Sequence, residues 1–272
     1  MAYGVNGIML KQVPDMQINL RKFRIYRVLR NTFSPEKFSD TRKLSGTKPE
    51  VLGSLTQNEW RKAGQAQVSG EEPTDPVHHA LMQRWQTNIS AMQELCDENG
   101  IALYIITTPP HLLYPPFYSS NSPDLTDQGI RSYSDFLKQS QDFERARSWK
   151  EMLNASQKAL GIEQYHAQGW FVHAKAQQKN EQISNALTSF ERALMLDISR
   201  KRTRLEYAKA AMNFCSQNSC TSMSAHDEMR KDVQDKGFSL YDQRFGDHEH
   251  LTPEGCAWIA SLFASLILES NP

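Results

Sequence analysis

The residues best suited to chemistry lie together near the carboxyl terminus, in the segment GDHEHLTPEG at positions 246–255. Asp247 and His250 are three residues apart there, a spacing at which a carboxylate and an imidazole of one tight loop can act together. The carboxylate would hold the imidazole in one tautomer and stabilise it once protonated, and the imidazole would remove a proton from a serine hydroxyl. We therefore predict that His250 is a general base and that Asp247 orients it.

Two other interpretations of this segment remain open. In the first, Asp247 caps a helix and the backbone satisfies the imidazole of His250. In the second, His248 and His250 bind a metal ion together with Asp247 or Glu249. Our prediction contains no metal site and no cofactor, because the remaining histidines show no ligand spacing and the sequence has no glycine-rich phosphate loop.

The elements that must position these residues form two similar units. In the first, Asp75 and Pro76 suit the start of a helix, apolar residues then repeat at helical spacing, and Gly100 suits its end. The continuous apolar run IALYII at 101–106 predicts a strand that is covered on both faces. His111 follows the end of this strand and is a candidate for lining the same cleft.

The second unit contains the chemical motif. Residues 224–236 look helical, Gly237 ends them, and FSLYD at 238–242 is a candidate short strand. Thr252 can cap a final helix with Pro253 at its first position. This order predicts that the loop with Asp247 and His250 lies at the carboxyl end of a strand, where open α/β sheets build their sites.

A helical insert of different character separates the two units. Residues 166–198 resemble one tetratricopeptide repeat, and residues 146–162 resemble the second helix of another. A generic helical hairpin is the alternative. The matching positions are Trp170, Ala174, Ala186, Phe190 and Ala193, and the departures are His173, Gln177 and Ile198, where Leu, Tyr and Pro are usual.

The carboxyl-terminal segment resembles the last sequence block of the SGNH (GDSL) hydrolase family, a D-x-x-H motif followed by a helix. Asp247, His250, the turn LTPEG and the apolar helix carry this resemblance. YGVN at 3–6 resembles the G-x-N block of the same family, which implies that Asn6 donates a hydrogen bond to the oxyanion. The resemblance to a bacterial subgroup with an embedded repeat implies a flavodoxin-like, three-layer parallel sheet. It also implies hydrolysis of acyl or acetyl esters on a small molecule, a glycan or a lipid.

The nucleophile block of that family has no counterpart in the sequence. No Gly-Asp-Ser occurs, and Ser54 and Ser69 lie in a polar stretch that follows no buried strand. We therefore predict no nucleophile and expect the chain to be the carboxyl-terminal portion of a longer protein, inactive by itself. The expected parts are an α/β part at 1–135 with a long loop at 34–75, a helical insert at 136–222, and a second α/β part at 223–272.

The composition of the chain limits the classes of partner that we expect it to bind. Among 272 residues, 31 are basic and 31 acidic, so the formal charge is zero and a nucleic-acid partner is not expected. The longest apolar run, at 258–268, is too short to span a bilayer, and no signal peptide is visible. The compartment stays open, with a periplasmic or membrane-associated location through a preceding part as one option. A basic, helix-like run at 14–30 suits a solvated face or a membrane surface. Cys215 and Cys220 either form a small disulfide or stay free.

Two functions from different classes follow from these observations. The first is an SGNH-like ester hydrolase, or an acyl transferase that uses the same groups. The second is a non-enzymatic module in which the repeat insert binds a protein partner and the α/β part is a scaffold.

Overall fold

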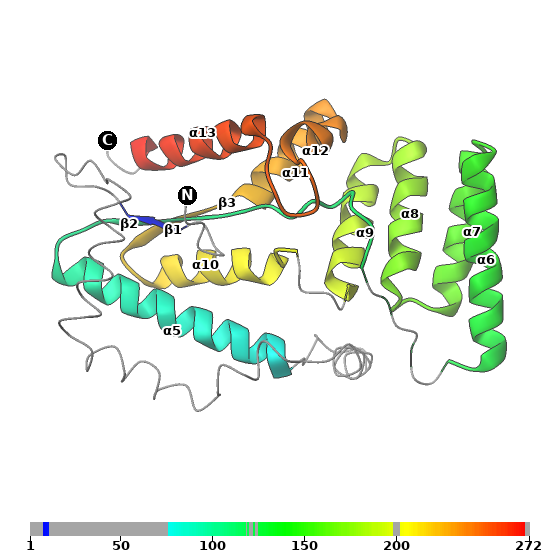
Figure 1. Ribbon diagram of the computed structural model, residues 1–272, viewed down its shortest axis with the longest axis horizontal. Coiled ribbons are helices and arrows are strands. Elements are labelled where there is room, and N and C mark those ends of the chain that lie inside the picture. The colour runs from blue at the N-terminus through cyan, green and yellow to red at the C-terminus, as the bar shows by residue number, and fades with distance from the viewer. Residues whose placement is uncertain are drawn as a thin grey trace.

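The computed structural model describes residues 8–10, 76–117, 119, 122, 125–197 and 202–269, with the backbone alone described at 8–10 and 76–81. Helices dominate these residues, and three short strands form one sheet (Figure 1). Asn6 and the segments 14–30 and 34–75, for which predictions were made above, lie outside the described residues. The elements in chain order are β1 (Ile8–Leu10), α5 (Pro76–Glu98), β2 (Leu103–Thr107), α6 (Asp127–Arg145), α7 (Trp149–Ile162), α8 (Ala167–Lys179), α9 (Ile183–Leu196), α10 (Leu205–Gln217), β3 (Cys220–Ser224), α11 (Ala225–Lys236), α12 (Ser239–Arg244) and α13 (Pro253–Glu269).

The sheet has the order β1-β2-β3. β2 pairs with β3 in parallel, with Ile105 opposite Ser222, and β1 pairs with β2 antiparallel. The predicted mixed α/β class is therefore confirmed, whereas the described sheet is mixed rather than wholly parallel. The parallel pair requires a long crossover, and helices α6 to α10 provide it.

Helices cover both faces of β2, as the apolar run at 101–106 predicted. Leu103 and Ile105 pack with α5 and α10 on one face, in a cluster that includes Trp85 and Ala211. On the other face, Tyr104 meets Phe263 of α13 edge to face, with ring centroids 6.4 Å apart. Figure 1 shows the resulting three layers, with α5 and α10 below the sheet and α11 and α13 above it.

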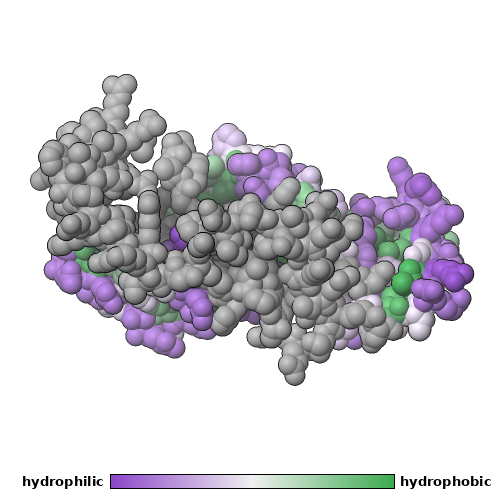
Figure 2. All heavy atoms as spheres, turned by 60° about the horizontal axis from the view of Figure 1, so that its bottom comes forward, coloured by the Kyte–Doolittle hydropathy of each residue, from purple (hydrophilic) through white to green (hydrophobic). Residues whose placement is uncertain are grey.

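The insert forms two helical hairpins, α6–α7 and α8–α9, stacked side by side at one end of the molecule (Figure 1). The predicted boundary at 135/136 falls inside α6, which is the partner helix of α7. The boundary at 222/223 falls inside β3, and α10 packs against the sheet rather than against the hairpins. Figure 2 shows mostly hydrophilic side chains over the hairpin end, with a few hydrophobic ones among them.

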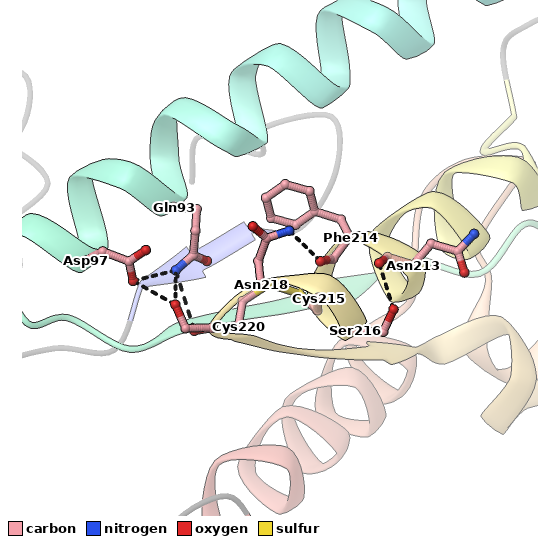
Figure 3. Close-up of a disulfide and its surroundings, with 9 residues drawn as sticks. Gln93, Asp97, Asn213, Phe214, Cys215, Ser216, Asn218 and Cys220 are labelled. Carbon is pink, nitrogen blue, oxygen red and sulfur yellow. Dashed lines mark hydrogen bonds between the residues drawn. A yellow bond between two sulfur atoms is a disulfide. The ribbon is translucent and has the colours of Figure 1, made fainter.

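Cys215 and Cys220 form a disulfide that links the end of α10 to the start of β3 (Figure 3). This settles the alternative that the sequence left open. Beside it, the Gln93 side chain donates to Asp97 at 2.7 Å and to the hydroxyl of Ser219 at 3.1 Å, so α5 is joined to the same turn. The disulfide and this network together fix the edge of the sheet where β3 begins.

One expected strand is wrong. Residues 238–242 precede the chemical motif, but they belong to helix α12 and its cap instead. Phe238, Tyr241 and Phe245 are all buried, a spacing of three and four residues that suits one face of a helix. The amide of Tyr241 donates to the carbonyl of Phe238 at 3.1 Å, and that of Phe245 to Tyr241 at 2.9 Å. Burial with the period of a helix therefore overrides the alternating pattern FSLYD.

Among the described helices, none combines the length and the hydropathy that a membrane-spanning segment needs.

Candidate functional site

Asp247 and His250 lie on a closed loop between α12 and α13. The loop is closed by a bridge between Phe245 and Leu251 and by a bond of 2.8 Å from the Gly246 amide to the His250 carbonyl. Thr252 then caps α13, because its hydroxyl accepts from the amide of Gly255 at 3.1 Å. The cap and the first helical residue of α13 are those that the sequence predicted.

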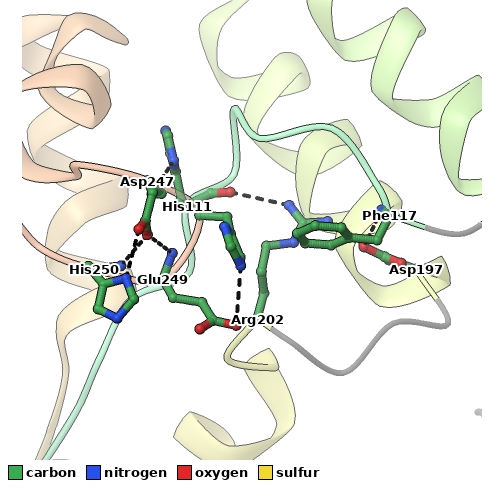
Figure 4. A network of polar contacts seen from close by, with 8 residues as sticks. His111, Phe117, Asp197, Arg202, Asp247, Glu249 and His250 are labelled. Atoms are coloured by element: carbon green, nitrogen blue, oxygen red, sulfur yellow. Dashed lines mark hydrogen bonds and ion pairs between the residues drawn. The ribbon is translucent and has the colours of Figure 1, made fainter.

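Both oxygens of the Asp247 carboxylate are engaged. Oδ2 lies 2.7 Å from Nδ1 of His250, and Oδ1 accepts from the amides of Glu249 at 2.8 Å and His250 at 2.7 Å (Figure 4). The two amide bonds, together with the imidazole, hold the pKa of Asp247 well below its ordinary range. The same contact raises the pKa of His250, because the carboxylate favours the imidazolium.

This geometry suits an oriented base. The carboxylate occupies Nδ1, so Nε2 of His250 is the nitrogen left to face a substrate or a nucleophile. The His250 side chain is 77% exposed, so the ring is open to a reacting group. The structure thus brings together the two residues that the sequence paired, and Nδ1 of His250 meets a carboxylate oxygen rather than the backbone.

The second histidine of the motif is arranged differently. Nε2 of His248 lies 3.4 Å from a carboxylate oxygen of Glu249, and its ring contacts those of Tyr114 and Phe117 at centroid distances of 5.1 and 4.9 Å. Among the described residues, no group of three or more His, Cys, Asp or Glu side chains is arranged to hold a metal ion.

His111 joins this site from the loop after β2. Its Nδ1 lies 3.0 Å from the backbone carbonyl oxygen of Asp247. The ring is buried and stacks on Phe245 at 4.8 Å with an interplanar angle of 7°, so the loop that follows α12 lies at the carboxyl end of β2 after all. His111 is therefore in direct contact with the loop of Asp247, and its lining of a cleft stays a prediction.

A buried ion pair holds the loop that carries His111, and sequence inspection did not single it out. Nη2 of Arg202 lies 2.8 Å from Oδ2 of Asp197, and their side chains are 2% and 1% exposed. Nη1 of Arg202 donates to the carbonyls of His111 at 3.3 Å and Tyr114 at 2.8 Å, and the amide of Phe117 donates to Asp197 at 3.0 Å (Figure 4). Removing one member of such a pair leaves a buried charge and typically costs about 3–5 kcal/mol.

The described hairpins border a cavity that is separate from the loop of Asp247. A cavity of about 700 Å³ lies among α6, α8, α9 and the loop after β2, with Leu113 and Pro115 from that loop in its wall. Three cations line it, Arg145, Lys175 and Lys179, and Lys175 forms an ion pair with Glu144. The loop that carries His111 therefore also borders this cavity of the helical insert.

No family model matches the chain, and neither a curated protein nor a solved structure matches it.

Proposed function

We propose that this chain supplies the base and its orienting carboxylate to a serine ester hydrolase of the SGNH type. The observation that carries the proposal is the contact of 2.7 Å between His250 Nδ1 and Asp247 Oδ2, with Oδ1 fixed by two backbone amides. Such a pair holds one imidazole nitrogen and offers the other to a hydroxyl.

The architecture supports this proposal in a coarser way. Three layers around a parallel pair of strands, with the site at the carboxyl end of β2, agree with the flavodoxin-like fold that we propose for the complete sheet. Asn6 precedes β1 by two residues in the sequence, and we assign it the role of oxyanion donor by its likeness to the G-x-N block.

The chemistry requires a serine hydroxyl in addition to these groups. His250 Nε2 takes the serine proton while Oγ attacks the ester carbonyl carbon, and the resulting oxyanion accepts a hydrogen bond from Asn6. Collapse of the intermediate breaks the bond to the alcohol, which leaves with the proton from His250. Water completes hydrolysis, or a second hydroxyl takes the acyl group in a transferase.

The second candidate function is a protein-binding module. The observation that favours it is the cavity of about 700 Å³ among α6, α8, α9 and the loop after β2. The stacking of the two hairpins agrees with the proposed tetratricopeptide-like repeats (Figure 1). In this case Asp247 and His250 would stabilise a loop and no serine would react.

Labelling with a fluorophosphonate probe separates the two functions. The protein to test is the full-length gene product, together with its H250A variant and the matched control H248A. We expect labelling in the full-length protein, a loss of at least 10³-fold in H250A, and retention in H248A. The chain of 272 residues tested by itself is expected to stay unlabelled.

Two results would overturn the hydrolase proposal. One is labelling that H250A does not reduce. The other is a full-length product that has no serine block after an apolar strand and does not react with the probe.

A further inference from the structure

His111 is a buried polar residue that touches the candidate site. It is 8% exposed, and its ring is nearly parallel to those of Phe245 at 4.8 Å and Tyr241 at 5.6 Å. These two rings are 6.0 Å from each other, so the three form one aromatic cluster. A buried imidazole packed against aromatic rings gains nothing over a phenyl ring unless its nitrogens bind something. The bond that His111 makes is therefore informative.

That bond goes to the backbone of Asp247. The carbonyl oxygen can only accept, so Nδ1 of His111 carries the proton and donates across 3.0 Å. The Asp247 carbonyl belongs to the peptide bond with His248. The next two amides along the chain, those of Glu249 and His250, bind the Asp247 carboxylate. Fixing this carbonyl therefore fixes the direction in which the carboxylate meets its three partners.

The anchor itself is rigid. Arg202 binds the carbonyls of His111 and Tyr114 and is neutralised by Asp197, so the segment from β2 to Phe117 is fastened to the buried interior. The Asp247 and His250 side chains, by contrast, are 45% and 77% exposed. An exposed loop needs such an anchor to keep two side chains in a fixed relation.

We propose that His111 is a positioning residue, which holds the Asp247 loop in the conformation in which the carboxylate meets Nδ1 of His250. The catalytic consequence rests on the proposed function, but the structural effect does not. The charged groups near His111 are Asp242 of α12, Asp247 of the loop and Arg202 of the α9–α10 connection, and burial lowers the pKa of His111. The ring thus stays neutral and keeps one defined donor.

The test is an NMR titration of the His250 ring in five proteins, which are the natural protein and four variants. The H250A variant serves only to assign the His250 signals. D247N removes the carboxylate and should lower the pKa of His250 toward its ordinary value. H111F keeps the stacked ring and removes the donor, so the pKa of His250 should fall in the same direction by several tenths of a pH unit. H111N places an amide donor near the position of Nδ1 and should restore part of that shift.

The fifth protein is a control for burial. H226F replaces another buried histidine, whose Nε2 binds Glu191 of α9 at 3.0 Å, and should leave the pKa of His250 unchanged. Circular dichroism of each variant at 25 °C verifies folding. H111L replaces H111F, and H111Q replaces H111N, if either variant is unfolded.

The outcomes separate the two proposals. If D247N shifts His250 and H111F does not, the positioning role of His111 is wrong while the dyad stands. If D247N itself leaves the pKa of His250 unchanged, the dyad and with it the proposed function fail. Equal shifts in H111F and H226F would mean that loss of any buried histidine loosens the loop, which would also overturn the inference.

Discussion

The pKa values of two buried histidines shift in the opposite direction to the pKa of the exposed His250. Asp247 raises the pKa of His250, whereas burial lowers the pKa of His111 and of His173. His173 lies in α8, 5% exposed, with its Nδ1 3.0 Å from the hydroxyl of Ser156 in α7. One imidazole thus joins the two hairpins, and its burial favours the neutral form.

His173 predicts a loss of stability in mild acid. Burial lowers its pKa to about 4, below the ordinary value of 6.5. Protonation therefore favours the unfolded chain, and the stabilising effect is complete above pH 6.5 and is lost as the pH falls toward 4. The loss from this residue amounts to roughly 3 kcal/mol.

Urea denaturation at pH 7 and pH 4.5 measures this loss. H173L should weaken the pH dependence, because Leu carries no proton and the Ser156 hydroxyl keeps its bond of 2.9 Å to the Leu153 carbonyl. If H173L and the natural protein lose the same free energy between the two pH values, His173 is not the group responsible.

Among the helices, Gly255 allows α13 to approach the end of α12 closely. A Cβ atom at this position would collide with the carbonyl of Arg244, the last residue of α12, and would lie 3.1 Å from the side chain of Leu251. Arg244 has little room to move, since it pairs with Asp232 at 2.8 Å. The glycine of the LTPEG turn is thus required by a backbone contact.

We predict that G255A destabilises the protein by about 3 kcal/mol, since the neighbouring group is backbone and cannot rotate away. The same change should displace the loop and lower the pKa of His250, which NMR titration measures. G161A is the matched control, because nothing lies within 4 Å of a Cβ there in helix α7. It should gain about 0.5–1 kcal/mol, and a similar loss in both variants would contradict the argument.

The ends of the helices are the part of the fold that the sequence could predict. Asp75-Pro76, Gly100 and Thr252-Pro253 mark helix ends through local chemistry, and α5 and α13 begin at the predicted prolines. β3 was missed because CTSMS has little apolar character, and its side chains are mostly half-buried at the strand that ends the described sheet. The partners of the Asp197–Arg202 pair could not be predicted, since His111 and Phe117 meet it through long-range folding.

In the described part of the molecule, one hydrophobic cluster joins the α8–α9 hairpin to α11, to the residues at α12 and to the loop after β2. Phe190 of α9 is 1% exposed and meets Phe171 of α8 at 5.4 Å and Phe238, next to α12, at 5.8 Å. The cluster continues through Met229 of α11 to Leu112 of the loop after β2. The α8–α9 hairpin is therefore expected to unfold together with α11 and α12 rather than as a separate unit.

Amide hydrogen exchange tests this cooperativity through two truncations. F190A should cost roughly 3–5 kcal/mol and reduce the protection of both α8 and α11 amides, because both helices pack into the cluster that contains Phe190. M152A removes a side chain from a separate cluster of α7 and α8, and it should reduce protection in the hairpins more than in β2. If F190A instead leaves the α11 amides protected, the α8–α9 hairpin and α11 unfold independently, and the cavity beside Leu113 and Pro115 would then have no cooperative connection to the loop of Asp247.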